Sequence, residues 1–126
     1  MSLISCTCFS GKPYLECCQV YHSNSGSAPT PEQLMRARYS AYALHLIDYL
    51  WDTTHPSKRY LYHKADIEKW AKDNHWLRLE IMVAKKDVVE FKAFYQQGLK
   101  EFVHHERSVF KKDAGKWYYF SGEHFH

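Results

Sequence analysis

The stretch LRLEIMVAKKDVVEFKAFY, residues 77–95, decides the fold of this chain, because its apolar residues recur at every second position. Alternate residues of a β-strand point to the same face of a sheet. The pattern therefore predicts two strands, each with one face buried. The polar run 85–87 between them predicts a turn.

The residues that follow extend this pattern into an antiparallel meander. A turn at 96–98 leads into a strand from about 100 to 111, and a turn at 113–115 leads into a strand at 116–120. The last four residues, 123–126, are expected to form a frayed tail. A second metal site in that tail, which contains Glu123, His124 and His126, is the less favoured alternative.

The region before the strands carries helix signals. Thr30 is expected as an N-cap, with Pro31 at the first helical position and Gln33 completing a capping box. Further helices are expected at about 47–53 and from 64 or 66 to 74. Helices followed by an antiparallel meander predict an α+β architecture, in which the helices pack on one face of a curved sheet.

All four cysteines lie close together near the N-terminus, as Cys6, Cys8, Cys17 and Cys18. Four thiolates match the tetrahedral preference of Zn2+, and four protein ligands leave no open position, so we expect a structural zinc ion. A segment this short buries little apolar surface, so metal binding would supply most of its folding free energy. His22 could replace Cys18 as the fourth ligand.

The composition argues against a dedicated nucleic-acid binder and against a membrane protein. The formal net charge is only +3, and acidic and basic residues are interleaved. No apolar stretch approaches the ~20 residues of a membrane span, and the N-terminus lacks a signal-peptide pattern. We therefore expect a cytoplasmic protein, in which thiols stay reduced and bind metal rather than form disulfides.

Two sets of motifs resemble known families. Residues 6–18, CTCFSGKPYLECC, resemble the SEC-C zinc motif, which also occurs at the C-terminus of the translocation ATPase SecA. The segments LMRARYSAY (34–42), HP (55–56), ERSVF (106–110) and GKWYY (115–119) look like the YchJ family of bacterial proteins. These segments follow one another in the family's order over nearly the whole chain.

The resemblance implies that residues 30–126 form a nuclear-transport-factor-2-like (NTF2-like) cone, in which helices close over a bent antiparallel sheet. Residues 1–22 would form a SEC-C-like zinc-binding module. The small residues of 23–29 predict a flexible linker between the two. One departure is Phe9, which stands where the SEC-C motif usually has glycine.

Several polar and aromatic residues are candidates for a ligand cavity in the cone: Arg38, Tyr42, His104, Glu106, Ser108 and Trp117. His104, Glu106 and Ser108 alternate along one predicted strand and therefore share a face. Arg38 should be internal. The preferred interpretation pairs it with a buried carboxylate such as Glu106, and the alternative directs it at an anionic ligand beside Tyr42. His55, before Pro56, is interpreted as a hydrogen-bond partner at a helix end rather than as a base.

Two functional hypotheses follow. The preferred one is a non-enzymatic, zinc-binding adaptor whose cysteine module docks a protein or nucleic-acid partner and whose cone holds a ligand. The alternative is an enzyme that acts on a small molecule in the cone through Arg38, Tyr42, His104 and Glu106. A homodimer through the open face of the sheet is a further expectation.

Overall fold

The computed structural model describes residues 4–24 and 28–125 of the chain, and its fold is α+β, as predicted. Four strands in the described residues form one antiparallel sheet in chain order: β1 His75–Lys85, β2 Val88–Gln97, β3 Lys100–Asp113 and β4 Lys116–Phe125. The helical elements all precede the sheet: η1 Tyr14–Glu16, α1 Gln19–Asn24, α2 Pro31–Leu44, α3 Ile47–Asp52, η2 Pro56–Leu61 and α4 Lys64–Asp73. None of the helices in this part of the chain is long and apolar enough to cross a membrane.

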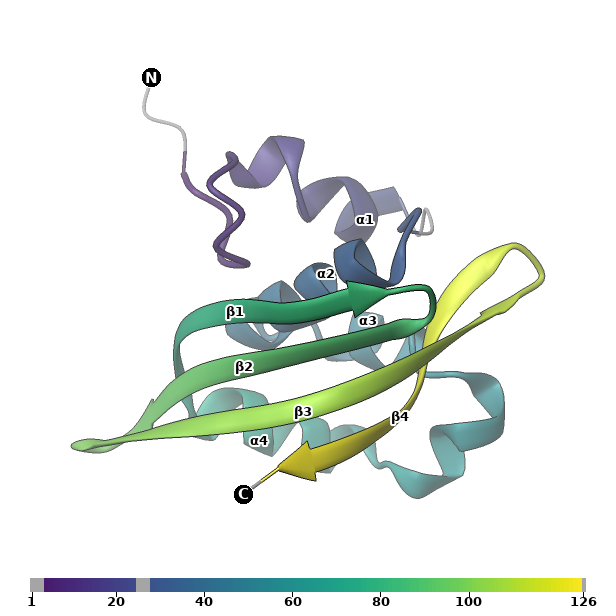
Figure 1. The fold of residues 1–126 in the computed structure, drawn as a ribbon. Helices are drawn as coiled ribbons and strands as arrows, with labels where there is room; N and C mark the ends of the chain where they lie inside the picture. The colour runs from purple at the N-terminus through teal and green to yellow at the C-terminus, as the bar shows by residue number, and fades with distance from the viewer. Residues whose placement is uncertain (1–3, 25–27, 126) are drawn as a thin grey trace.

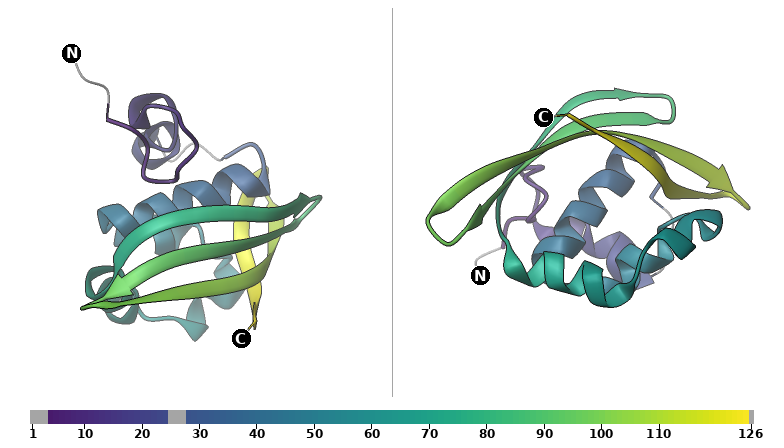
Figure 2. Two further views of the ribbon diagram at one scale, coloured as in Figure 1. Left: turned by 60° about the vertical axis from the view of Figure 1, so that its left-hand side comes forward. Right: turned by 90° about the horizontal axis from the view of Figure 1, so that it is seen from below.

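The sheet is bent, and the helices lie on its concave side (Figure 2). The pairing of β1 with β2 skips Leu77 and Met82, and the pairing of β3 with β4 skips Phe120. An extra residue of this kind increases the local twist of a strand and bends the sheet. The bend leaves room for α2 and α4 beneath the sheet, which produces the expected cone.

Helix α2 is the central element of the molecule, between the cysteine module and the sheet (Figure 1). Its start agrees with the sequence, because the Gln33 amide donates to the Thr30 hydroxyl at 3.2 Å and Pro31 is the first helical residue. Leu34 and Tyr39 are fully buried and belong to the same apolar cluster as residues of β2 and β3. Burial of these large side chains against the sheet fixes the position of the helix.

The predicted frayed tail at residues 123–126 is wrong for the residues that the structure describes. Strand β4 continues to Phe125, with Glu123 opposite Arg107 and His124 opposite Glu106. Strand β3 is long enough to offer hydrogen-bonding partners to these residues, so the tail is held as a strand. His126 lies outside the described residues.

The first two residues of the predicted linker at 23–29 are helical. Helix α1 continues through Ser23 to Asn24, and the Ser23 hydroxyl donates to the carbonyl of Gln19. Ala28 is buried in the same apolar cluster as Leu34. Residues 25–27 of the predicted linker lie outside the described part of the chain.

Candidate functional site

The four cysteines converge on one point in the N-terminal module. Their sulfur atoms lie within 4.8 Å of one another, with Cys8 and Cys17 separated by 3.6 Å and Cys17 and Cys18 by 4.0 Å. Tetrahedral ligation at a Zn–S length of ~2.3 Å requires sulfur atoms ~3.8 Å apart. The cluster therefore fits a metal ion with four thiolate ligands and no open position.

The backbone of the module brings the two cysteine pairs together. The Cys6 amide donates to the carbonyl of Lys12 at 2.9 Å, and the Tyr14 amide donates to the carbonyl of Ile4 at 2.9 Å. Phe9 lies in the turn between these contacts with φ 62°, the left-handed conformation that glycine adopts easily. The structure thus accommodates Phe9 at the glycine position of the motif, with its ring packed edge-on against Tyr39.

The thiols differ in acidity even without a metal ion. A hydrogen bond from Cys18 lowers the pKa of Cys8, whose thiolate the other thiols also stabilise. The hydrogen bond to Cys8 and burial raise the pKa of Cys18, and burial raises the pKa of Cys17. The charge on neighbouring thiolates contributes to the raised pKa values of Cys17 and Cys18, so a cation at the centre of the cluster would favour ionisation of these two thiols.

His22 does not lie in the group of four sulfur atoms, although it was an alternative ligand. Its Nε2 lies 2.8 Å from the carbonyl oxygen of Ala37, to which it donates, and its Nδ1 lies 2.8 Å from the Tyr14 hydroxyl. A neutral imidazole that donates through one nitrogen accepts through the other, so His22 has no lone pair to spare for a metal ion. This arrangement favours the four cysteines as the ligand set.

The same contacts attach the module to α2. Besides the His22 contact with Ala37, the Arg36 Nη1 donates to the carbonyl of Cys8 at 3.0 Å, and the hydroxyls of Thr7 and Ser40 are hydrogen-bonded. The face of α2 that carries these residues is therefore covered by the module and not by solvent.

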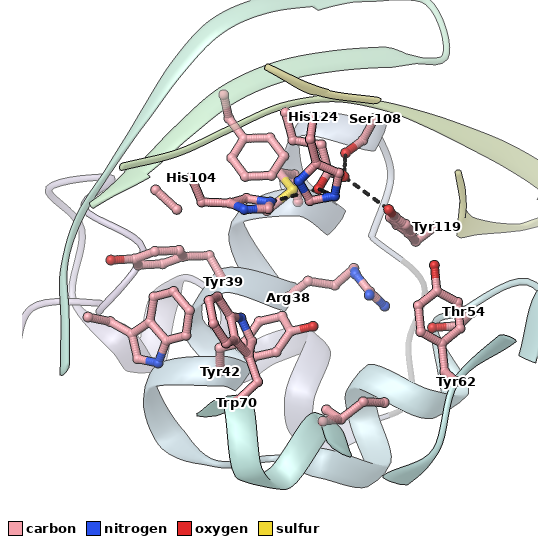
Figure 3. Close-up of a pocket in the computed structure, with 16 residues that line it drawn as sticks. Arg38, Tyr39, Tyr42, Thr54, Tyr62, Trp70, His104, Ser108, Tyr119 and His124 are labelled. Carbon is pink, nitrogen blue, oxygen red and sulfur yellow. Dashed lines mark hydrogen bonds and ion pairs between the residues drawn. The ribbon is translucent and has the colours of Figure 1, made fainter. Parts of the chain in front are cut away.

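A cavity of about 390 Å³ lies inside the cone, between α2, α4 and the sheet. Five of the six predicted cavity residues line it: Arg38, Tyr42, His104, Glu106 and Ser108. The structure adds residues that the sequence did not assign to the cavity, among them Thr54, Tyr62, Trp70, Tyr119 and His124 (Figure 3). The wall is thus rich in aromatic side chains, with a small polar group on the sheet side.

Glu106 is the centre of that polar group and is only 5% exposed. Its Oε1 lies 2.8 Å from Nε2 of His104 and 3.5 Å from Nε2 of His124. Its Oε2 accepts hydrogen bonds from the hydroxyls of Ser108 and Tyr119, the latter at 3.0 Å. Burial alone would raise the pKa of Glu106, but the hydrogen bonds from His104, Ser108 and Tyr119 outweigh it and hold the pKa below its ordinary value.

Gly122 provides the room that this carboxylate occupies. A Cβ atom at position 122 would overlap Oε2 of Glu106 and would lie 2.6 Å from the hydroxyl of Tyr119. Both separations are far below van der Waals contact. The position of Glu106 therefore depends on the absence of a side chain on the neighbouring strand.

Arg38 is internal, as predicted, but the predicted ion pair with Glu106 is wrong. Its Nη1 donates instead to the carbonyl of Leu50 at 2.9 Å and to the hydroxyl of Thr53 at 2.7 Å, because α3 presents these acceptors closer to the guanidinium. Its remaining N–H groups have no partner among residues 4–24 and 28–125, and the side chain is only 7% exposed. The guanidinium lies 4.7 Å from the centre of the Tyr119 ring. Arg38 is thus a buried cation without a carboxylate partner in this part of the chain.

Two predicted residues lie away from the cavity. Trp117 does not line it, which corrects the prediction, and lines a separate pocket beside Tyr49 of α3. Residues 53–55 pair in parallel with β4 at Tyr119, where the Tyr119 amide donates to the carbonyl of Thr53 and the His55 amide donates to the carbonyl of Tyr119, and Trp117 precedes this pairing. His55 caps the start of η2, where its Nδ1 accepts from the Ser57 amide at 3.2 Å.

Comparison with known proteins places these features in a family. The family model described as "YchJ, middle NTF2-like domain" matches residues 30–122. A UPF0225 protein of Haemophilus influenzae is 40% identical over 124 residues, which cover 94% of this chain and 77% of the relative. A UPF0225 protein of Vibrio parahaemolyticus is 38% identical over 124 residues, covering 94% of this chain and 74% of the relative.

Two solved structures have the same fold. The solution structure of a SEC-C motif containing protein from Rhodopseudomonas palustris superimposes with a TM-score of 0.89 at 39% sequence identity and covers 98% of this chain and 100% of that one. The crystal structure of a SEC-C motif containing protein from Psychrobacter arcticus gives a TM-score of 0.77 at 31% identity and covers 92% of this chain and 80% of that one.

Proposed function

The chain belongs to the YchJ family of bacterial proteins, and we propose that it binds an anionic small molecule in the cavity of its NTF2-like cone. The observation that carries the proposal is Arg38, a largely buried residue on the cavity wall whose guanidinium has N–H groups without a protein partner and no carboxylate beside it in the described residues. Burying a charge is costly unless a partner compensates it. An anionic ligand would supply that compensation.

The cavity supports this proposal by its size and lining. Its volume of about 390 Å³ lies within the range of small-molecule sites, which run from ~300 to ~1,000 Å³. Aromatic side chains such as Tyr42, Trp70 and Trp76 form much of its wall. A planar guanidinium suits a carboxylate or phosphate, so the ligand we expect combines such a group with an apolar or aromatic body.

Thermal denaturation with paired probes tests the proposal. Aromatic carboxylates and aryl phosphates, each beside a neutral counterpart of the same shape, are added to the full-length protein and to Arg38→Met. We expect the anionic probes to raise the melting temperature of the wild type and to lose most of this effect in Arg38→Met. Arg107→Met, on the opposite face of the sheet, is the matched control. Equal responses to charged and neutral probes would disprove an anion site.

The alternative is an enzyme that uses His104 and Glu106 as an acid–base pair. Their 2.8 Å contact on the cavity wall is the observation that favours it. The discriminating result is turnover: a bound probe that is recovered unchanged supports a binding protein, and a chemically altered one supports the enzyme.

For the cysteine module we propose a structural Zn2+ ion and a role in docking a protein partner in the cytoplasm. Ile4, Phe9, Leu15 and Val20 are exposed on it, which suits a protein surface better than nucleic acid. Partners are first recovered with the wild-type protein, and the complex is then reconstituted from purified proteins. We expect Leu15→Asp to bind such a partner at least ~10-fold more weakly, which corresponds to a loss of about 1.4 kcal/mol in binding free energy. Leu99→Asp, on the distant β2–β3 turn, is the control. Equal loss in both variants would count against the docking role, and a homodimer stays a prediction.

A further inference from the structure

The polar group on the sheet side of the cavity contains three metal-ligating atoms at one point. One ring nitrogen each of His104 and His124 and a carboxylate oxygen of Glu106 lie within 4.8 Å of one another. From this geometry we infer that His104, Glu106 and His124 form a second metal site, for a divalent first-row transition ion, inside the cone. The site is separate from the four cysteines and differs from them in ligand chemistry.

The distances suit such an ion. Ligand bonds of ~2.0 to ~2.2 Å place neighbouring ligand atoms ~3 to ~3.5 Å apart in tetrahedral or octahedral geometry. The two contacts of Glu106 Oε1, 2.8 Å to His104 and 3.5 Å to His124, span this range. Two imidazoles and one carboxylate are also a donor set that zinc and ferrous iron accept.

The surroundings of Glu106 leave one of its oxygens available. Ser108 and Tyr119 both donate to Oε2, whereas the partners of Oε1 among the described residues are the two histidines. Hydrogen bonds of this kind orient metal-binding carboxylates in known sites. Gly122 leaves the space into which the carboxylate fits. The carboxylate is therefore held in place before any ion arrives.

Three protein ligands do not complete the coordination sphere of such an ion, and the open positions face the cavity. This distinguishes the site from the cysteine cluster, whose four ligands close the sphere. The ion would add positive charge to a cavity that already contains Arg38. The inference does not depend on the anionic ligand proposed above, because metal binding is measured here without any such ligand.

Equilibrium dialysis of the full-length protein tests the site. The protein is first loaded with one equivalent of Zn2+, which thiolates retain against Co2+ because Co2+ binds more weakly. Dialysis against Co2+ should then give one cobalt per chain beside the zinc. The absorption spectrum of that cobalt should lack the near-ultraviolet bands of thiolate-to-cobalt charge transfer.

Matched variants on the two faces of the sheet locate the ion. We expect His124→Gln and Glu106→Gln to lower the cobalt affinity at least ~10-fold, and Tyr119→Phe, which keeps all three ligands, to lower it by about 10-fold. His105→Gln and Glu90→Gln, the corresponding pair on the outer face, should leave it unchanged. His124→Gln, at an exposed position, and Tyr119→Phe keep the test valid if Glu106→Gln does not fold.

Three results would overturn the inference. They are the absence of cobalt beyond the zinc in the wild type, cobalt with a thiolate spectrum, and equal losses in the inner and outer variants.

Discussion

The two faces of β3 carry the same kinds of residue in opposite settings. On the outer face Glu90 of β2 meets His105 at 2.9 Å and Arg107 at 3.1 Å, so the carboxylate has a permanent cation beside it. On the inner face Glu106 meets His104 and hydroxyl groups, and no Arg or Lys pairs with it among the described residues.

This difference distinguishes a surface ion pair on the outer face from a candidate ligand-binding site on the inner face. A carboxylate paired with an exposed arginine gains little, and its charge is satisfied without any ligand. A buried carboxylate held by histidines and hydroxyl groups has no permanent cation beside it, so it can also bind a cation that enters the cavity. The chain thus pairs a carboxylate with a guanidinium on the outer face, whereas Glu106 and Arg38 lie on the walls of the cavity without such an ion pair between them.

Gly122→Ala should break the inner arrangement most strongly. The new methyl group would overlap Glu106 Oε2 and the Tyr119 hydroxyl, so the carboxylate must move or the strand must shift. Overpacking of this kind costs about 2 to 3 kcal/mol in the free energy of unfolding. Urea denaturation measures the loss, and Ser121→Ala, at the next residue, should change stability far less. A Gly122→Ala variant as stable as the wild type would show that Glu106 is not held as described.

Glu106→Ala should be the next largest effect. It leaves Ser108 and Tyr119 without their acceptor, which costs about 1 to 3 kcal/mol. Glu90→Ala on the outer face should cost less, because its partners remain in contact with water. Equal losses of unfolding free energy at the two positions would remove the contrast between the faces.

Arg38→Met should act in the opposite direction on stability and on binding. The Leu50 carbonyl keeps a donor in the Thr54 hydroxyl at 2.9 Å, and the buried charge disappears. We expect the free energy of unfolding to stay unchanged or to rise by about 1 kcal/mol. The same preparations should no longer respond to anionic probes in thermal denaturation. A large destabilisation would mean that Arg38 has a structural role.

Glu90→Gln should give the smallest effect, visible only in its pH dependence. Hydrogen bonds from His105 and Arg107 lower the pKa of Glu90 in the folded state. Stability from this group is therefore present above its unfolded pKa of ~4.3 and is lost as the pH falls through the lower folded value. Denaturation series below pH 5 should show a shallower acid loss in Glu90→Gln than in the wild type. The difference should shrink in 1 M salt, since exposed charges are screened.

The sequence predicts the fold well, because hydrophobic alternation and the Thr30 capping signal are local. It also places His104 and Glu106 on one face, since both lie on the same strand. It could not place His124 beside them. Tyr119 and His124 are an odd and an even position, which point to opposite faces in a regular strand. Both line the cavity because the pairing of β3 with β4 skips Phe120.

Arg38 shows a second limit. Its burial follows from the helix face on which it lies, but its acceptors are a main-chain carbonyl and a hydroxyl of α3. A backbone carbonyl leaves no trace in residue identity, so the sequence suggested a carboxylate partner instead. The prediction that Trp117 lines the cavity was wrong for a similar reason, because the pairing of residues 53–55 with β4 is a tertiary feature.

The position of α2 links metal binding in the cysteine module to the integrity of the cavity. One face of the helix is bound to the module through Arg36, and Arg38 two residues further on forms part of the cavity wall. An ion that binds only the folded module stabilises the module and every part of the chain that unfolds together with the module. The stabilisation is about 4 kcal/mol when the free ion concentration is 1,000 times the dissociation constant. The fraction of chains with an intact cavity would then follow the free metal concentration around the protein, although the thiolate-bound ion never touches the cavity.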